Sequence, residues 1–399
     1  MDAARCGRCA AWAQNCCPRF GRERGDLARY TTVLLACVRN GSSEPRKIRR
    51  RAPAKSPAVS EGGAAPSLIL SSNRPSVGAA GDENRPRTDF EVLAGKIGGR
   101  ILYPGGGAHG VALLEDRLRV DFSQAVRARR ARPSAYVSFS ERVGMPLSLL
   151  RPQAPHLLIA HVLTSRQKRL VARTTRFLER TDKTLVFSRP QERYLREEVG
   201  LGESKARFIW DKVDHSFFTP GPANASGTYV LSVGREQRDY QTLVDAMRPL
   251  PIRCIIVAGS AWSHRALVPL SLPDHVELRE GLSYPALREL YRGARVVVVP
   301  VLAGVDYAAG VNGVLEAMSC ARPVIVSDTP GLDGYVRDGE DGRLVPAGDS
   351  ESLGRVLQEL WEDRSQAARL ASAARTSVER GRTVDHFAAR VAEMVDSIA

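Results

Sequence analysis

Short apolar runs alternate with longer amphipathic stretches from about residue 67 to the end of the chain. The stretches carry apolar residues at helical spacing, as in 284–292, where Leu287, Leu290 and Tyr291 share one face. This alternation is typical of a parallel sheet covered by helices. The predicted strands of the first series are Ser67–Leu70, Arg100–Tyr103, Ala135–Phe139, His156–Ala160, Thr184–Phe187 and Arg207–Trp210. Those of the second series are Tyr229–Val233, Arg253–Val257, Val276–Leu278, Arg295–Pro300, Pro323–Val326 and Arg343–Val345.

The segment Thr219-Pro-Gly-Pro222 separates the two series and has the composition of a hinge. We therefore predict an α/β protein with two doubly wound, Rossmann-like domains, one over 66–220 and one over 221–399. In such sheets ligands bind beyond the carboxyl ends of the strands, which places the expected site in a central cleft that the two domains face.

Residues 1–65 lack this pattern and carry 13 basic and 5 acidic side chains. Five of the seven cysteines lie in this stretch, and Cys6-x-x-Cys9 with Cys16-Cys17 has the spacing of a zinc knuckle, although no histidine lies near. The basic run 46–51 could bind nucleic acid or be a solvated tail. We interpret 1–65 as a disordered, basic, cysteine-containing extension and expect no specific nucleic-acid partner.

Composition narrows the class of protein. The 399 residues are 43% hydrophobic and 26% charged, ordinary values for a globular protein. No stretch approaches the roughly 18 consecutive apolar residues of a membrane span, and no signal for export is recognisable. We therefore expect a cytoplasmic protein, with peripheral attachment to the inner face of the cell membrane as a further expectation.

The positive charge is concentrated before the hinge. The net charge is +10 over 66–215 and −4 over 216–399. One helical stretch, 166–183, carries seven basic residues beside apolar ones, and a basic amphipathic helix can lie on an anionic membrane surface. A solvated helix face explains the same pattern. The basic half thus predicts an acidic acceptor or an anionic membrane surface as a partner.

The segment 307–331 gives the most specific indication of a ligand-binding site in the sequence. It reads as a loop with Gly310 and Gly313, a helix that carries Glu316, and a further strand. Backbone N–H groups at such a helix start can hold a diphosphate, and one turn further in a carboxylate can accept hydrogen bonds from ribose hydroxyls. The same residues could instead serve only a tight turn and a surface ion pair.

This segment, together with Val233-Gly-Arg235 and Asp338-Gly-Glu-Asp-Gly-Arg-Leu-Val-Pro-Ala-Gly-Asp349, resembles the donor-binding domain of family 4 retaining glycosyltransferases of the GT-B fold. The similarity covers 226–399 well and 66–225 more loosely. It implies a hexosyltransferase-type enzyme that moves a sugar from a nucleotide-diphosphate donor to an acceptor hydroxyl with retention of configuration. It also implies that a final helix, here near Val384–Ser397, packs back on the N-terminal domain.

Carried over residue by residue, the resemblance places Arg235 and Arg238 at the donor diphosphate, next to Gly234. Glu316 matches the second glutamate of the family's Glu-x7-Glu motif. Ala308 stands where the first glutamate belongs. This departure leaves three alternatives: Asp306 takes over the contact to the sugar, the backbone of Gly310, Val311 and Asn312 suffices, or the protein is a weakened relative.

In the first domain, His161 follows a strand and resembles the family's histidine near the transferred sugar. Asn73 and Gly78, after the first strand, and His109 are further candidates for a loop near the phosphates and the acceptor. A mobile loop and a structural histidine are the competing interpretations.

No Asp-x-Asp occurs in the chain, so we expect no metal and no cofactor beyond a UDP- or GDP-sugar as cosubstrate. Arginines and helix amides would stabilise the leaving diphosphate instead. The acceptor class stays open among a glycan, a lipid-linked molecule and a small molecule. A nucleotide-sugar epimerase and a non-catalytic nucleotide-sugar or glycan-binding relative remain alternatives.

Overall fold

The computed structural model describes residues 67–71, 83–105, 115, 118–222, 227–258 and 271–399. The predicted extension over 1–65 lies outside the described residues, as do Asn73, Gly78 and His109. All twelve predicted strands are present, each within a few residues of its expected bounds.

The first six strands form one parallel sheet in the order β2-β1-β3-β4-β5-β6. Their bounds are β1 Leu68–Leu70, β2 Arg100–Leu102, β3 Tyr136–Ser138, β4 His156–Ala160, β5 Lys183–Val186 and β6 Ala206–Phe208. The helices of this half are α3 Asp89–Ile97, α5 Phe122–Arg129, α6 Glu141–Leu150, α7 Arg166–Thr175, η1 Leu178–Arg180, α8 Arg189–Arg193 and η2 Tyr194–Glu198. The strand order reverses between β1 and β3, the point at which a doubly wound sheet exposes a ligand crevice.

The last six strands form a second parallel sheet in the order β12-β11-β10-β7-β8-β9. Their bounds are β7 Tyr229–Val233, β8 Cys254–Val257, β9 Val276–Arg279, β10 Ala294–Val299, β11 Val324–Asp328 and β12 Arg343–Pro346. The helices are α9 Tyr240–Met247, α10 Tyr284–Gly293, α11 Val311–Ser319, η3 Pro330–Leu332, α12 Ser350–Glu362, α13 Arg364–Glu379 and α14 Val384–Asp396. Here the reversal lies between β7 and β10.

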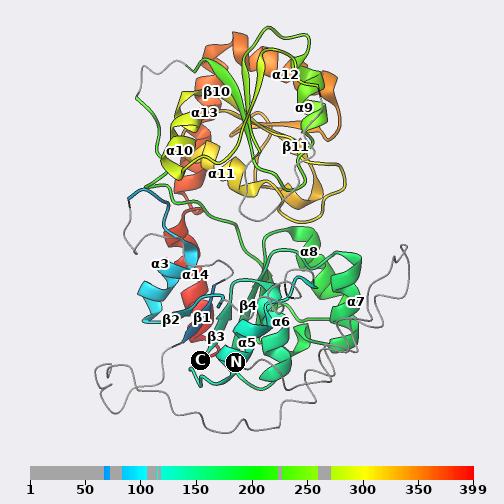
Figure 1. Ribbon diagram of the computed structural model, residues 1–399, viewed down its shortest axis with the longest axis vertical. Coiled ribbons are helices and arrows are strands. Elements are labelled where there is room, and N and C mark those ends of the chain that lie inside the picture. The colour runs from blue at the N-terminus through cyan, green and yellow to red at the C-terminus, as the bar shows by residue number, and fades with distance from the viewer. Residues whose placement is uncertain (1–66, 72–82, 106–114, 116–117, 223–226, 259–270) are drawn as a thin grey trace, which may run out of the picture. The chain divides into compact units, whose positions relative to one another are not determined.

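Helices cover both faces of this second sheet (Figure 1). Val297 and Val299 of β10 point into a core shared with α10, α11 and part of α13, whereas Val296 and Val298 point into a core shared with α9 and α12. A strand that is buried on both faces needs apolar residues at every position, which explains the uninterrupted run over 296–299.

The last helix returns to the first sheet. Phe387, Ala388 and Val391 of α14 are buried in one core with Phe90 of α3 and Phe139 beside β3. The predicted helix over 384–397 therefore contributes to the core of the N-terminal half. Among the residues that the structure describes, no helix combines the length and the apolar character needed to span a bilayer.

The chain passes from the first sheet to the second after β6 and comes back before α14, and the two crossings are hydrogen-bonded to each other. The N–H of Val213 donates to the carbonyl of Arg382 at 3.0 Å, and the N–H of Val384 donates to the carbonyl of Val213 at 3.0 Å. The two halves are thus joined by a short parallel ladder at Val213 and Thr383.

Lys212 secures these crossings. Its Nζ lies 2.5 Å from Asp89 of α3 and 3.0 Å from Asp211, and it sits over the rings of Phe187 and Phe387 at 5.0 and 4.7 Å. Burial opposes the charged form, but Asp211 and Asp89 outweigh it and raise the pKa of Lys212 above its ordinary value. One ammonium group therefore bridges two carboxylates where three segments of the chain meet.

We predict that Lys212→Met lowers the free energy of unfolding by about 3 kcal/mol, because removal of one partner leaves charges buried without compensation. Urea unfolding followed by fluorescence measures the change. Lys96→Met, at an exposed position on α3, is the matched control and should cost less than about 0.5 kcal/mol. Equal stability of the two variants would contradict a stabilising role for the Lys212 cluster.

Candidate functional site

Candidate site residues of the C-terminal half lie at the carboxyl ends of β7 and β10, where the strand order reverses. Gly234 directly follows β7, and the loop 300–310 connects β10 to α11. The loop is held to the segment after β7 by backbone bonds, from the N–H of Leu302 to the carbonyl of Gln237 at 3.0 Å and from Asp239 to Pro300 at 3.1 Å.

Arg238 lies at the centre of this region with its guanidinium buried. Its Nε donates to the carbonyl of Val233 at 3.1 Å and its Nη1 to the carbonyl of Glu236 at 2.9 Å. Burial lowers its pKa from the ordinary value, but an arginine remains charged. A side chain at position 234 would collide with this guanidinium, because a Cβ added to Gly234 would lie 2.3 Å from Nη2 of Arg238. A Cβ added to Gly313 would lie 3.8 Å from the same nitrogen.

These glycines make room for the guanidinium. Gly234 has φ +119 and Gly310 has φ +95, both in the region that favours glycine. A Cβ on Gly310 would lie 3.2 Å from Nη1 of Arg238. The sequence placed Gly234, Gly310 and Arg238 in one site, and the structure brings all three together.

Helix α11 begins in this region with Gly310 as its N-cap and has no side-chain cap. The N-terminal end of a helix concentrates partial positive charge and N–H groups without intrahelical partners. Val311 is buried and Asn312 is exposed in its first turn. The guanidinium of Arg238 and the start of α11 therefore present positive charge to the same place.

Glu316 lies one turn further along α11. Its Oε2 accepts a hydrogen bond of 2.8 Å from Oη of Tyr291, a buried residue of α10. Burial raises the pKa of Glu316 to about 7, although Tyr291 and Arg238 favour the ionised form. The carboxyl group can thus change its protonation state near neutral pH.

Arg235 points to another strand end. Its Nη2 lies 3.2 Å from Oε1 of Glu280, which directly follows β9. Leu282 and Tyr284, just beyond Glu280, are large side chains that are 36% and 48% exposed. An exposed ring and an ion pair therefore border the region on the β9 side.

Asp306 is engaged with the N-terminal half. Its Oδ1 accepts a hydrogen bond of 2.7 Å from Thr164, and its carbonyl accepts one of 2.8 Å from Ser188. Ala308 is partly buried and packs against the cores of both halves. The carboxylate of Asp306 retains a second oxygen, but its position is set by Thr164.

His161 follows β4, as predicted, and lies at the carboxyl end of the first sheet. Its Nε2 is 3.1 Å from the carbonyl of Phe139, and its ring lies 5.2 Å from that of Phe187. The backbone N–H of His161 donates to Oε2 of Glu141 at 2.9 Å. Although burial opposes ionisation, Lys168 and His161 hold the pKa of Glu141 below its ordinary value.

The region 227–363 matches the family model described as glycosyl transferases group 1. The chain is 32% identical over 117 residues to a D-inositol 3-phosphate glycosyltransferase of Streptomyces bingchenggensis, a match that covers 29% of this chain and 25% of the relative. It is 35% identical over 162 residues to a phosphatidyl-myo-inositol mannosyltransferase of Mycobacterium leprae, covering 39% of this chain and 42% of the relative. We refer to residues 227–363, which match this family model, as the group 1 domain.

Solved structures show the fold of the whole described chain. The HepE protein of Anabaena, in complex with UDP-glucose, superposes with a TM-score of 0.65 at 16% identity, covering 83% of this chain and 99% of that one. Sucrose-phosphate synthase from Thermosynechococcus elongatus gives a TM-score of 0.65 at 20% identity, covering 84% and 98%. The chain therefore has the two-domain GT-B fold. It covers less than half of each of the two curated relatives named above.

Three side chains that the sequence left without a role hold the candidate residues in place. Tyr291 bonds Glu316 of the group 1 domain, Glu280 pairs with Arg235, and Glu141 bonds the backbone of His161. Tyr291 was assigned only to an apolar helix face. Glu280 and Glu141 each directly or nearly follow a predicted strand, and that position is the signal that could have identified them.

We predict that Gly234→Ala destabilises the group 1 domain by about 2 kcal/mol more than Gly339→Ala, because it displaces Arg238 from its two backbone acceptors. Gly339 is the matched control, since its φ is +71 but a Cβ there meets nothing within 4 Å. Urea unfolding of both variants measures the difference. Equal losses would mean that the backbone conformation alone, and not Arg238, requires Gly234.

We predict that Glu316 makes the free energy of unfolding depend on pH. The pKa of its carboxyl is raised from 4.5 to about 7, so the folded state retains a proton that the unfolded state has lost, and the protein loses stability as the pH rises from 4.5 to about 7. The parent should lose roughly 1.4 kcal/mol of unfolding free energy per pKa unit, whereas Glu316→Gln has no such carboxyl. The difference in unfolding free energy between the variant and the parent should therefore shift by about 3 kcal/mol in favour of the variant between pH 4.5 and 8. Urea unfolding across this range checks it. Parallel profiles for the two proteins would contradict the raised pKa.

Proposed function

We propose that the chain is a glycosyltransferase that moves a sugar from a nucleotide-diphosphate sugar, with UDP or GDP as the nucleotide, to an acceptor hydroxyl. One observation carries the proposal: a buried arginine, an uncapped helix start and a titratable carboxylate meet where the strand order reverses in the group 1 domain. This combination provides groups for a phosphate and for a ribose in adjacent positions.

The diphosphate would bind between Arg238 and the start of α11. Nη2 of Arg238 is the guanidinium nitrogen that the backbone carbonyls of Val233 and Glu236 do not engage. The N–H groups of Asn312 and Gly313 lie in the first turn of α11, where anions are favoured. Arg235 would add a second cation if the diphosphate draws it away from the exposed Glu280.

The ribose would bind to Glu316. Tyr291 occupies one site on Oε2, which leaves Oε1 to accept from sugar hydroxyls. Burial disfavours the ionised carboxylate, and hydroxyl donors from a ligand would favour it. Burial raises the pKa of Tyr284 and the charge of Glu316 raises it further, so the ring lies near Glu316, and its exposed face would contact the attached base.

The proposed reaction retains the configuration at the anomeric carbon. The bond between this carbon and the donor phosphate oxygen breaks, the acceptor oxygen bonds to the same face, and the acceptor proton passes to the departing phosphate. Arg235, Arg238 and the start of α11 would stabilise the charge that develops on the diphosphate, so the proposal includes no metal. His161, whose Nε2 faces a carbonyl, would position the sugar from the first sheet.

The relatives support this proposal through their names, which describe glycosyltransferases, and the HepE structure contains UDP-glucose. Ala308 stands at the position of the first glutamate in the Glu-x7-Glu motif, so another group must contact the transferred sugar. Because the side chain of Asp306 is held by Thr164, we assign the contact to the transferred sugar to the backbone over 310–312.

The acceptor would be a glycan, a lipid-linked molecule or a small molecule on the side of the basic first half. Three basic residues of the stretch 166–183 bond carboxylates, Lys168 to Glu141, Arg169 to Glu198 and Arg176 to Glu179. Arg166, Arg173 and Arg180 are exposed. Fewer positive charges are therefore available to an anionic membrane surface than the sequence suggests. The three exposed arginines keep peripheral attachment to the inner face of the cell membrane as part of the proposal for a cytoplasmic protein.

We predict that one of UDP and GDP binds the full chain and that Glu316→Gln weakens this binding by about tenfold or more at pH 8, since a charged acceptor is lost. Glu393→Gln, at an exposed position of α14, is the matched control and should leave the affinity unchanged. The affinity of the parent should rise as the pH passes about 7, because the carboxylate is the better acceptor. Isothermal titration calorimetry measures all three.

Transfer is tested with the nucleotide sugar of the base that binds, by following nucleoside-diphosphate release with and without acceptors. Release that requires an acceptor supports a transferase. Release without any acceptor would indicate an epimerase or hydrolase, and binding without release would indicate a non-catalytic relative. Failure of every nucleotide to bind would contradict the proposed donor site.

A further inference from the structure

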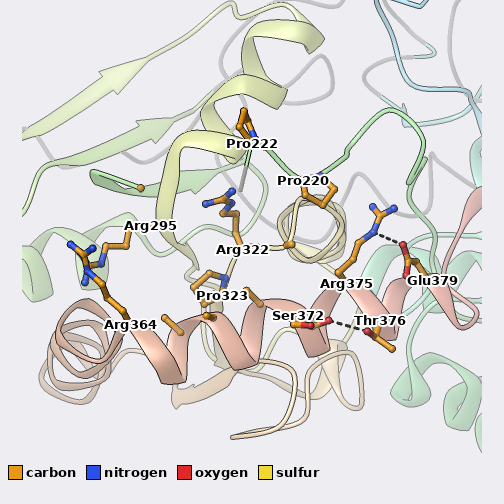
Figure 2. A pocket seen from close by; sticks show the side chains of 16 residues that line it. Pro220, Pro222, Arg295, Arg322, Pro323, Arg364, Ser372, Arg375, Thr376 and Glu379 are labelled. Atoms are coloured by element: carbon orange, nitrogen blue, oxygen red, sulfur yellow. Dashed lines mark hydrogen bonds and ion pairs between the residues drawn. The ribbon is translucent and has the colours of Figure 1, made fainter. Parts of the chain in front are cut away.

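An open cavity of about 720 Å³ lies in the C-terminal half, at the amino ends of the strands of the second sheet and away from the candidate donor site. Arg295 at the start of β10, Arg322 just before β11 and Arg364 at the start of α13 line it (Figure 2). The rest of the lining is mostly small or apolar, with Gly221, Ala367 and other such residues along α13 and the hinge.

Two of the arginines lie close together at one end of the cavity (Figure 2). The charge of Arg364, together with burial as the larger cause, lowers the pKa of Arg295. Arg295 also lies over the ring of Trp361 at 4.6 Å and donates to the Trp361 carbonyl. Arg364 is exposed. Two like charges held near each other cost free energy that an anion between them would recover.

Arg322 points into the cavity toward Pro222 (Figure 2). Its Nη1 donates to the carbonyl of Ala294 at 3.2 Å, and burial lowers its pKa. Among the described lining residues the only acidic one is Glu379, which pairs with Arg375 at 2.7 Å. Arg375 is otherwise occupied by carbonyls of the crossing and of α11, such as Ser319 at 2.7 Å. The other three arginines have no carboxylate partner among the described residues of the lining.

We propose that this cavity binds a phosphate-bearing small molecule, held by Arg295, Arg322 and Arg364. Arginine binds phosphate with paired N–H groups, and three guanidinium groups suit a phosphomonoester or a diphosphate. The volume lies within the range of roughly 300 to 1,000 Å³ that holds small ligands, so a phosphate joined to a sugar or nucleoside fits better than phosphate alone.

This site is separate from the proposed donor site and does not depend on it. The donor site uses Arg238 and α11 at the carboxyl ends of β7 and β10, whereas the cavity lies at the opposite ends of β10 and β11. A ligand that occupies one should therefore leave the other free.

The test uses inorganic pyrophosphate as the probe, titrated into the full chain by calorimetry at low salt, with and without saturating UDP. We expect Arg364→Glu and Arg322→Gln each to weaken binding by about tenfold or more, because each removes a charge-assisted bond to phosphate. Arg369→Glu is the matched control: it makes the same change of charge at an exposed position of α13 outside the cavity, and it should alter the affinity less than about twofold.

Retention of pyrophosphate binding when UDP is present would support a site apart from the donor site. Three results would overturn the proposal: no binding by the parent at millimolar pyrophosphate, an equal effect of Arg364→Glu and Arg369→Glu, or complete displacement of pyrophosphate by UDP. Failure of both UDP and GDP to bind would count against the donor site alone, since the comparison of variants at the cavity needs no nucleotide.

Discussion

The pairing of the two chain crossings is the constraint on which the arrangement of the protein depends. The outgoing segment at Val213 and the returning segment at Thr383 form one short ladder, and Lys212 fixes that ladder to α3 through Asp89. Because α14 follows the return directly, the ladder lies at the start of the helix that completes the first core beside Phe90. The core of the N-terminal half thus includes residues from the last part of the sequence.

At the candidate donor site, backbone carbonyls hold the guanidinium of Arg238 in place before any ligand binds. Burying a guanidinium is unfavourable unless its donors are satisfied, and the carbonyls of Val233 and Glu236 satisfy two of the nitrogens of Arg238. A charge held by the backbone need not reorganise when a phosphate arrives, which is the condition for effective electrostatic stabilisation. The glycines at 234 and 310 are therefore best understood as space for the guanidinium and not as hinges.

The sequence predicted the strands because both faces of a parallel sheet are buried, so each strand is a short apolar run, as Val296–Val299 illustrates. It could not predict the strand order, since every order of parallel strands satisfies the same pattern. It selected Arg238 and Glu316 as candidates through a family resemblance, but Tyr291 bonds Glu316 from another helix, and nothing local to Tyr291 distinguishes it from a core residue. Asp306 was a candidate for a sugar contact, yet its bond to Thr164 depends on the other half of the chain.

The position of charge along the strands explains why two anion sites can coexist in the C-terminal half. At the carboxyl ends of β7 and β10 positive charge comes from the start of α11 and from Arg238, whereas at the amino ends, where α11 ends, it comes chiefly from arginine side chains. Arg295, Arg322 and Arg364 supply it there, although the domain region after residue 215 carries a net charge of −4. These three arginines have no carboxylate partner in the described lining and repel one another, and a phosphate ligand provides the compensation that this lining does not.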